Sequence, residues 1–412
     1  MRWRKLLAAV IALAWCSFVS FVDLFAADWP HWLGPNNNGS SPETGLLTKW
    51  PDKGPKVLWK VPGGEGYSSI AVADGRAITL VQRDGKELCV AFDAVKGDKL
   101  WEQPIGPLYK NNFGNGPRST PTIDGNSVYA QSVSGPLVCL VAGSGKPIWS
   151  VDILKEFNGK NLTWGLAASP LVDGNLVYAL PGAPGASVAA FDKKTGKLAW
   201  KAGDDAAAYA SPVIATVDGK KQLVVFNAFG LVGYTADAGK ELWRIPWKTE
   251  FDVNICTPLI LGDRMFVASG EHVGSTLFQF KDGKPAVVWE SKGKKDQVMT
   301  TYWANAVEHQ GYLYGMSGEF DKRIDLNCVD VKTGKLQWSQ KDFGKAAITL
   351  ADGHLWMATK TGDLVLVHCN PKAYQEKARV VGFLGDNRTV PTIANGRLYV
   401  RDLQKVWCLE IK

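Results

Sequence analysis

Short apolar segments recur along this chain, and each follows a turn that contains glycine. Clear examples are SVYAQS (127–132), NLVYAL (175–180), MFVASG (265–270) and YLYGMS (312–317). Segments of this length, rich in β-branched and aromatic residues and bounded by turn residues, predict β-strands. The pattern therefore predicts a chain built from many short strands.

A glycine at the tip of a tight turn marks the first strand pair of each repeat. The turn glycines are Gly75, Gly125, Gly174, Gly219, Gly262, Gly311, Gly353 and Gly396. Five follow Asp and one follows Asn, and these pairs accept positive φ angles in a two-residue turn. Several of the hairpins begin at a Ser-Pro or Thr-Pro step, as in ASPLV and STPTI. Each repeat therefore starts with a β-hairpin.

Tryptophan marks the second half of each repeat. Segments such as FDKKTGKLAW and VDVKTGKLQW predict a strand, a glycine turn and a further strand that opens with Trp. The marker residues lie 42 to 51 positions apart: Trp59, Trp101, Trp149, Trp200, Trp243, Trp289 and Trp338. A large side chain at this position in every repeat can fill the wedge between neighbouring units, burying about 150–250 Å² each.

The two markers together specify how the ring closes. There are eight hairpin glycines but seven Trp, because the strand at 378–381 has no Trp and the last repeat ends at Lys412 after three strands. The strand around Trp59 precedes the first hairpin and is free to complete that last sheet. We therefore predict an all-β fold, an eight-bladed β-propeller of four-stranded antiparallel blades closed by an N-terminal strand. A solenoid or a sandwich does not explain the borrowed strand.

The N-terminus has the order of a secretory signal. Three basic residues in MRWRK precede an uncharged apolar run over 6–22, and Phe25-Ala26-Ala27 supplies a small-residue cleavage site. We expect a signal peptide at 1–27, a lead-in segment at 28–56 and the propeller at 57–412. The protein is then periplasmic or secreted, with no transmembrane domain in the mature chain. An uncleaved N-terminal anchor is the alternative, since the apolar run approaches membrane-spanning length.

Charge and cysteine content narrow the function classes. The chain has 47 basic and 40 acidic residues without a block of like charge, so no nucleic-acid partner is expected. Six cysteines follow the expected signal, and most occupy small-residue positions of separate repeats: Cys89, Cys139, Cys256, Cys328, Cys369 and Cys408. We expect buried free thiols, with disulfides in an oxidising compartment as the alternative.

The motif D-x-x-T-G-K-x-x-W, clearest at Asp192–Trp200 and Asp330–Trp338, carries a family resemblance. The chain resembles the pyrroloquinoline-quinone (PQQ) repeat propellers over 57–412. These include the quinoprotein alcohol dehydrogenases and the outer-membrane assembly propeller lipoproteins. The dehydrogenase branch implies an adjacent Cys-Cys pair, a Ca²⁺ site and an aspartate base. This sequence has no Cys-Cys pair, so we assign no catalytic residue, no metal ligand and no cofactor. Binding of PQQ with Ca²⁺ is the alternative.

Residues before the first strand of each blade are expected to surround one mouth of the central channel. The candidates for a ligand- or partner-binding funnel are Tyr67, Arg118, Trp164, Tyr209, Asn254, Trp303 and Arg388. The neighbouring acids Glu250, Asp252 and Asp386 lie on the same loops. Aromatic rings and Arg at one mouth can stack on and hydrogen-bond a planar or anionic ligand. The alternative is that these residues plug the channel or cap the blades.

These observations favour a monomeric, non-catalytic binding or scaffold protein of the cell envelope. Its partner would be an envelope protein, or a small-molecule ligand at the funnel. A PQQ-dependent oxidoreductase acting on alcohols or sugars is the main alternative. A carbohydrate-binding module rests on the funnel aromatics alone.

Overall fold

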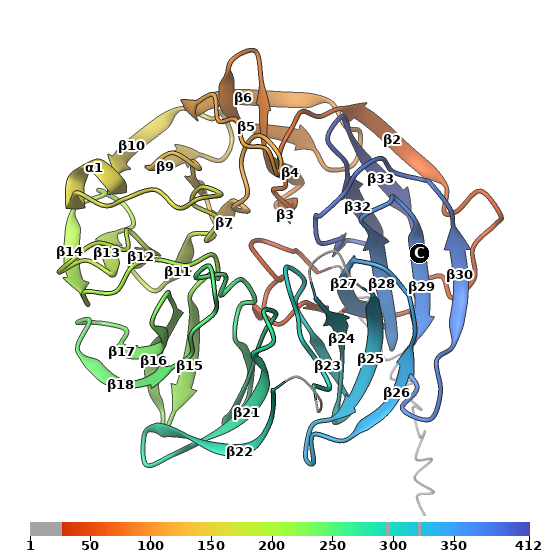
Figure 1. Ribbon diagram of the computed structural model, residues 1–412. Coiled ribbons are helices and arrows are strands. Elements are labelled where there is room, and N and C mark those ends of the chain that lie inside the picture. The colour runs from red at the N-terminus through yellow and green to blue at the C-terminus, as the bar shows by residue number, and fades with distance from the viewer. Residues whose placement is uncertain (1–26, 294–296, 320–322) are drawn as a thin grey trace, which may run out of the picture.

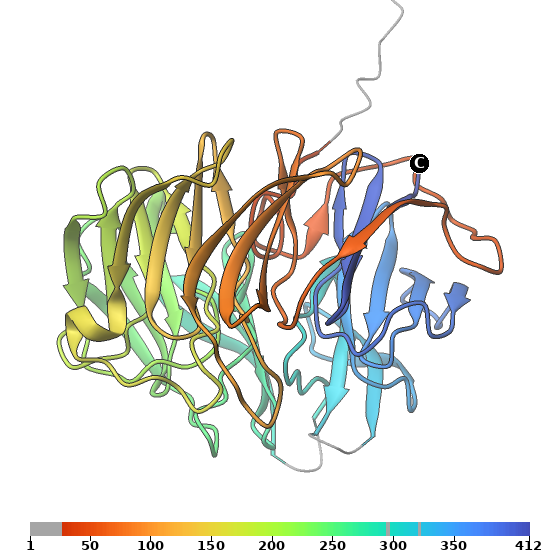
Figure 2. The same ribbon diagram turned by 90° about the horizontal axis from the view of Figure 1, so that it is seen from above.

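Eight antiparallel sheets surround a central axis, so the predicted eight-bladed β-propeller is confirmed (Figure 1). The structure is a computed structural model, and it describes residues 27–293, 297–319 and 323–412. The expected signal peptide lies outside these residues except for Ala27. Figure 2 shows the ring from its edge, with the strands running between its two faces. Within the described residues, no helix has the length and apolar character needed to cross a membrane.

The strands follow one another from the inside of each blade to its outer edge. Blade 1 consists of β3 (Ala71–Ala73), β4 (Arg76–Arg83), β5 (Lys86–Asp93) and β6 (Lys99–Pro107), and blade 2 consists of β7 (Thr122–Asp124), β8 (Ser127–Gln131), β9 (Pro136–Val141) and β10 (Pro147–Asp152), which is followed by helix α1 (Ile153–Phe157). Blade 3 consists of β11 (Leu171–Asp173), β12 (Leu176–Ala179), β13 (Val188–Asp192) and β14 (Leu198–Ala202). Blade 4 consists of β15 (Val213–Val217), β16 (Lys220–Phe226), β17 (Gly230–Thr235) and β18 (Glu241–Pro246).

Blades 5 to 8 repeat this arrangement, with two strands contributed from the N-terminal segment. Blade 5 consists of β19 (Leu259–Leu261), β20 (Arg264–Ser269), β21 (Gly274–Lys281) and β22 (Lys284–Lys292), and blade 6 consists of β23 (Val307–His309), β24 (Tyr312–Gly318), β25 (Ile324–Asp330) and β26 (Leu336–Gln340). Blade 7 consists of β27 (Ala346–Ala351), β28 (His354–Thr359), β29 (Leu364–His368) and β30 (Glu376–Val380), with β1 (Ser40–Ser41) added parallel to β27. Blade 8 consists of β31 (Thr392–Ala394), β32 (Arg397–Arg401), β33 (Lys405–Glu410) and β2 (Val57–Pro62).

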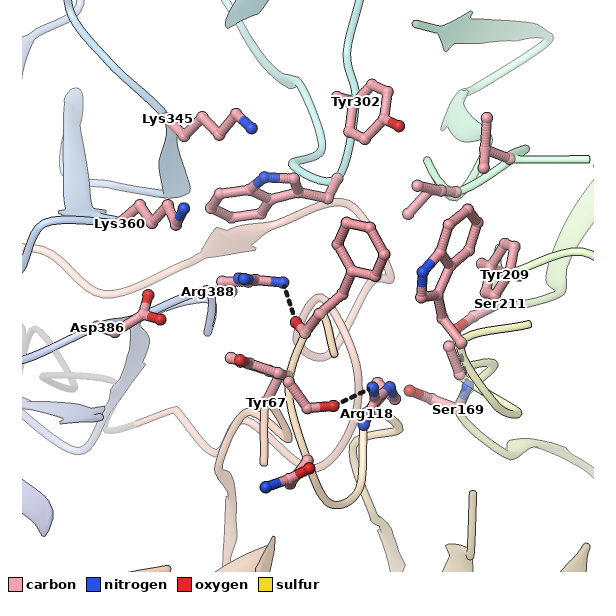
Figure 3. A pocket seen from close by; sticks show the side chains of 18 of the residues that line it. Tyr67, Arg118, Ser169, Tyr209, Ser211, Tyr302, Lys345, Lys360, Asp386 and Arg388 are labelled. Atoms are coloured by element: carbon pink, nitrogen blue, oxygen red, sulfur yellow. Dashed lines mark hydrogen bonds between the residues drawn. The ribbon is translucent and has the colours of Figure 1, made fainter. Parts of the chain in front are cut away.

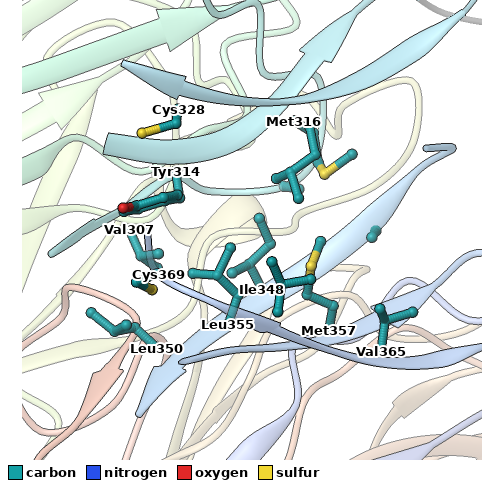
Figure 4. Packing of buried hydrophobic residues seen from close by; sticks show 14 of the residues in the cluster. Val307, Tyr314, Met316, Cys328, Ile348, Leu350, Leu355, Met357, Val365 and Cys369 are labelled. Atoms are coloured by element: carbon teal, nitrogen blue, oxygen red, sulfur yellow. The ribbon is translucent and has the colours of Figure 1, made fainter. Parts of the chain in front are cut away.

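The predicted hairpin glycines all connect the first two strands of a blade. At Asp74-Gly75, for example, the φ angles are +48° and +74°, a pair that a two-residue hairpin turn requires. Packing between blades is apolar: Figure 4 shows Tyr314 and Met316 of blade 6 facing Ile348 and Met357 of blade 7. Buried side chains thus fill the space between adjacent sheets.

The six cysteines of the described chain are all buried and unpaired, as predicted. Two of them lie in the interface of Figure 4, Cys328 on β25 and Cys369 just after β29. They pack there as small apolar side chains.

The borrowed strand closes the ring as the sequence predicts. Strand β2 pairs antiparallel with β33, with Trp59 opposite Cys408 and Val61 opposite Val406. Blade 8 therefore contains three C-terminal strands and one N-terminal strand. The pairing covers the β33 edge, which would otherwise expose unpaired backbone groups.

A buried arginine adds a second closure between the last and first blades. The guanidinium of Arg401, on β32, is fully buried. Its Nη1 donates to the backbone oxygen of Leu80 at 2.6 Å and to Thr79 Oγ1 at 3.0 Å, and Nη2 donates to the Gly64 oxygen at 2.7 Å. Burial lowers the pKa of Arg401 to about 10, so the group remains charged at neutral pH. Carbonyl dipoles of blade 1 thus solvate a charge carried by blade 8.

The repeated Trp packs on the glycine turn of the next blade. Trp59 Nε1 donates to the Ala94 oxygen at 3.1 Å, and a Cβ built on Gly97 would lie 2.8 Å from the indole. Equivalent indole-to-carbonyl bonds join Trp101, Trp149, Trp289 and Trp338 to Ala142, Lys193, Val331 and Asn370. For these blades, the predicted wedge role is confirmed.

Trp243 departs from this pattern. Its Nε1 donates to Gln222 Oε1 at 2.7 Å within its own blade, and the indole packs beside Phe280. The next blade has Asp282-Gly283 at the corresponding turn, and a Cβ at Gly283 would have no neighbour within 4 Å. Without a turn that approaches closely, the indole has no glycine to pack on across the interface.

We expect Gly97→Ala to destabilise the fold more than Gly75→Ala. Both glycines have positive φ, +80° and +74°, so both variants bear the same backbone penalty of about 1–2 kcal/mol. Only the Gly97 variant also drives a methyl group into Trp59, which adds about 1–3 kcal/mol. Urea unfolding of the two variants measures the difference, and equal midpoints would contradict the docking role of the Trp.

The lead-in segment crosses the face of the ring that carries the hairpin turns. The backbone of Trp29 pairs with Val72 of blade 1, while β1 joins blade 7. Asp28 accepts hydrogen bonds from the Asp74 amide and from Asn395 Nδ2, both at hairpin turns. In Figure 1 this red-orange segment passes through the centre of the ring. The proposed boundary at residue 56 falls directly before β2.

Glu87, on β5, is a buried carboxyl between blades 1 and 2. Its Oε2 accepts hydrogen bonds from Ser132 Oγ at 2.5 Å and from the Val133 amide at 3.1 Å, while Oε1 has no hydrogen-bond partner among the described residues. Burial raises the pKa of Glu87 to about 6 despite these bonds. The folded state therefore holds this proton more tightly than the unfolded state does.

We expect Glu87→Gln to stabilise the protein at pH 7.5 and to have little effect at pH 4. Because the folded pKa is raised, the cost of ionising Glu87 is fully present above about pH 6 and disappears as the pH falls below its unfolded value. A shift of this size corresponds to about 2 kcal/mol at most. Urea unfolding at both pH values measures the effect, and an equal gain at pH 4 and pH 7.5 would contradict it.

Candidate functional site

A cavity of about 850 Å³ occupies the central channel at the face opposite the hairpin turns. Residues from the segments that precede the inner strands of several blades contribute to its walls. The lead-in segment contributes Trp32, whose neighbour Leu33 packs against Ala347 and Val390. The lead-in thus closes one end of the channel, and the site is a blind funnel.

Six of the seven predicted funnel residues line this cavity. They are Tyr67, Arg118, Trp164, Tyr209, Trp303 and Arg388. Asp386 also lines it, whereas Glu250 and Asp252 do not. Asp252 instead forms an ion pair with Lys248 at the surface.

The structure does not bring the Asn254 side chain to the funnel. Asn254 is fully buried, and its Nδ2 donates to the backbone oxygens of Asn227 at 2.8 Å and Trp247 at 3.1 Å. Its own backbone oxygen accepts from the amide of Tyr209 at 3.0 Å. Asn254 therefore holds the loop that carries Tyr209 and does not itself line the cavity.

Sequence reasoning missed several residues that line the cavity. Trp32 comes from the lead-in, Phe113 from the loop between β6 and β7, and Phe251 from the loop after β18. Lys345 directly precedes β27, and Lys360 follows β28. An aromatic residue in a long loop between blades, such as Phe113 or Phe251, was a sequence signal that could have indicated a lining residue.

One side of the funnel is an aromatic wall. The Trp164 ring lies 5.5 Å from Tyr209 and meets Phe113 edge-on at 5.9 Å between ring centroids. Phe113 is 51% exposed and Phe251 is 59% exposed. Burial raises the pKa of Tyr209 to about 12, so its phenol stays protonated at neutral pH. Exposed aromatic rings around a cavity are typical of a binding surface.

Two arginines hold the loop that carries Phe113. Arg118 donates to the backbone oxygens of Gly114 and Gly116, and Arg388 Nη1 donates to the Phe113 oxygen at 3.1 Å. Arg388 also stacks over the Tyr67 ring, 4.6 Å from its centroid. Figure 3 shows Arg388 and Lys360 on the side of the cavity away from Tyr209. The funnel therefore has a cationic side facing the aromatic wall.

Two of the three acids that line the funnel, Glu65 and Glu271, accept hydrogen bonds. Glu65 accepts from Gln82 and Asn115, both at 3.0 Å, and Glu271 accepts from the Tyr302 hydroxyl at 3.2 Å. Across the described ranges, no group of three or more His, Cys, Asp or Glu side chains could hold a metal ion. The described lining also contains neither His nor Cys. These residues do not fit the Ca²⁺ and PQQ arrangement of the dehydrogenase branch.

Known proteins share this fold and part of this sequence. The chain is 26% identical over 320 residues to outer membrane protein assembly factor BamB of Shewanella oneidensis, covering 72% of this chain and 73% of the relative. Among solved structures, BamB from Moraxella catarrhalis matches with a TM-score of 0.60 and 16% identity, covering 87% of this chain and 98% of that one. Quinohemoprotein alcohol dehydrogenase from Comamonas testosteroni matches with a TM-score of 0.67 and 12% identity, covering 93% and 80%.

The structural matches show the fold alone, because their identities are low. The sequence of the repeats is more specific. A family model described as outer membrane protein assembly factor BamB matches residues 85–249 and 187–341, which together span more than half of the chain. The chain therefore belongs to this PQQ-like propeller family.

Proposed function

We propose that this protein is an exported, non-catalytic binding propeller that engages an envelope protein at its funnel, in the manner of an outer-membrane assembly factor. The observation that carries the proposal is a blind, aromatic-walled funnel on a chain whose repeats match the BamB family. The relatives named as outer membrane protein assembly factors support this role. The signal at 1–27 supports a periplasmic or secreted location, and a monomer is the proposed state.

The chemistry of the funnel supports binding rather than catalysis. Arg118 is occupied by backbone oxygens, Glu65 and Glu271 accept hydrogen bonds, and the Tyr209 phenol is neutral. A general acid or base requires a group that titrates near neutral pH and faces the cavity. Glu87 titrates in this range but lies between blades, outside the cavity lining.

Co-purification tests the proposal with a matched pair of variants. Phe251 lies at the funnel and is 59% exposed, whereas Val287 lies on the outer strand β22 and is 57% exposed. We expect Phe251→Ser to reduce recovery of a cross-linked envelope protein severalfold, and Val287→Ser to leave it unchanged. Equal recovery with both variants would contradict binding at the funnel.

A second measurement tests the non-catalytic part of the proposal. The purified protein is incubated with PQQ and Ca²⁺, and dye-linked oxidation of alcohols and aldoses is followed. We expect no turnover. Saturable PQQ binding with substrate-dependent dye reduction would overturn the proposal in favour of a quinone-dependent oxidoreductase.

A further inference from the structure

Arg388 presents unused hydrogen-bond donors to the funnel. Its Nη1 is occupied by the Phe113 oxygen, and stacking on Tyr67 fixes the plane of the guanidinium. Among the described residues, Nη2 donates to no acceptor, and the buried Nε has no partner either. An arginine that is held in place by one hydrogen bond and still has a free N–H group can donate to a bound oxyanion.

Lys360 adds a second positive charge on the same side of the cavity. Its side chain is half-buried and lines the funnel, and no ion pair or hydrogen bond of its Nζ occurs within the part of the chain that the structure describes. Asp386 lines this side as well, but among the described residues no salt bridge joins it to Arg388. Arg388 and Lys360 together outweigh the single charge of Asp386.

The opposite wall fits a different part of the same ligand. Phe113, Trp164 and Phe251 offer partly exposed ring faces, and the floor carries the Trp32 and Trp303 indoles. Such a wall favours an aromatic or apolar body over a strongly hydrated one. A ligand that spans the funnel would therefore be apolar at one end and anionic at the other.

We infer that the funnel binds a carboxylate carried on an aromatic or apolar body, with the carboxylate at Arg388 and Lys360 and the body against the aromatic wall. The carboxylate belongs either to a free small acid or to the end of a peptide chain, since the chemistry is the same. The inference rests on the proposed binding role of the funnel and adds the ligand class to it.

The test compares an acid with its neutral amide by isothermal titration calorimetry. We expect the full mature chain to bind 3-phenylpropionate about tenfold more tightly than 3-phenylpropionamide, because charge-assisted hydrogen bonds to Arg388 form only with the acid. A tetrapeptide, acetyl-Ala-Ala-Ala-Phe, with a free or an amidated end distinguishes the two sources. Tighter binding of the free-ended peptide than of 3-phenylpropionate assigns the carboxylate to a chain end, and the reverse order assigns it to a small acid.

Variants separate recognition of charge from folding. Arg388→Lys and Lys360→Gln should each remove most of the preference for the acid over the amide. Asp386→Asn should strengthen acid binding by about two- to threefold, a gain that loss of structure cannot produce. Lys372→Gln is the matched control, because Lys372 is exposed in a turn after β29, outside the cavity lining.

Two outcomes would overturn the inference. One is equal binding of acid and amide by the wild type, or no saturable binding of any probe. The other is an unchanged acid preference in both Arg388→Lys and Lys360→Gln. If either result occurs while Phe251→Ser still reduces capture of an envelope protein, the inferred ligand class is wrong and the proposed function stands. If the acid preference is intact but no envelope protein is captured through Phe251, the proposed function is wrong and the ligand class stands.

Discussion

A chain that lacks residues 57–62 is expected to lose its stable closed ring. Strand β2 contributes Trp59, which is 7% exposed and packs against Phe92 and Tyr399. Removing a Trp from such a site costs about 3–5 kcal/mol on its own. The deletion also exposes the β33 edge and the partly buried faces of Leu58 and Val61. We expect a loss of at least about 5 kcal/mol of unfolding free energy, or an aggregated product.

Urea unfolding and size-exclusion chromatography measure this outcome. Val57→Ser is the control, because Val57 lies on the same strand and is 44% exposed, so its loss should change stability by less than about 0.5 kcal/mol. A deletion variant that elutes as a monomer with an unchanged unfolding midpoint would refute closure by β2.

Arg401→Met should destabilise the ring by about 3–5 kcal/mol. Methionine fills much of the same volume but cannot donate, so the oxygens of Leu80 and Gly64 and the Thr79 hydroxyl lose their buried donor. Each of these groups belongs to blade 1 or to the loop that precedes it. The effect should therefore appear as weaker closure between the last and first blades.

Arg397→Met supplies the comparison. Arg397 lies four residues earlier on β32, is half-buried, and donates to the oxygen of Asn395 in its own hairpin turn. Its removal should cost under about 1 kcal/mol. Urea unfolding curves of both variants decide the matter, and similar midpoints for the two would show that Arg401 has no special role in closure.

The architecture was predictable because the same turn and tryptophan positions recur in successive repeats of the sequence. Asp74-Gly75 and its equivalents require positive φ angles, and Trp59 has no other sheet to complete than the last one. Arg401 was not predictable as a closure residue. An arginine in an apolar strand reveals its role only when the blade 1 carbonyls that surround it are known.

The funnel was predictable in part, for the same reason. Tyr67 and Arg388 occupy equivalent positions before inner strands, so the repeat places both at the mouth. Asn254 also lies in such a loop, but its side-chain amide donates to backbone oxygens. The spacing of residues along the sequence does not show in which direction a side chain of this loop points. Trp32 lies in the lead-in, which has no repeat equivalent, and Lys360 lies in the turn between β28 and β29. Their positions depend on how the lead-in crosses the ring and how one loop of blade 7 folds.

Relatives with this fold include a dehydrogenase and an assembly factor, so the ring alone does not specify function. The candidate site of this chain lies in the channel of the ring. The lead-in closes it on one side, and the open side combines the aromatic wall with Arg388 and Lys360. Among the described residues, no group of three or more His, Cys, Asp or Glu side chains could hold a metal ion in this funnel.

Site-specific photo-cross-linking in intact cells tests the central claim, a binding funnel on a non-catalytic propeller, most directly. A benzophenone amino acid is placed at Phe251 in one strain and at the equally exposed Val287 in another. The account predicts one discrete adduct with an envelope protein from position 251 and none from position 287. Adducts only from position 287, or the same adducts from both positions, would contradict it.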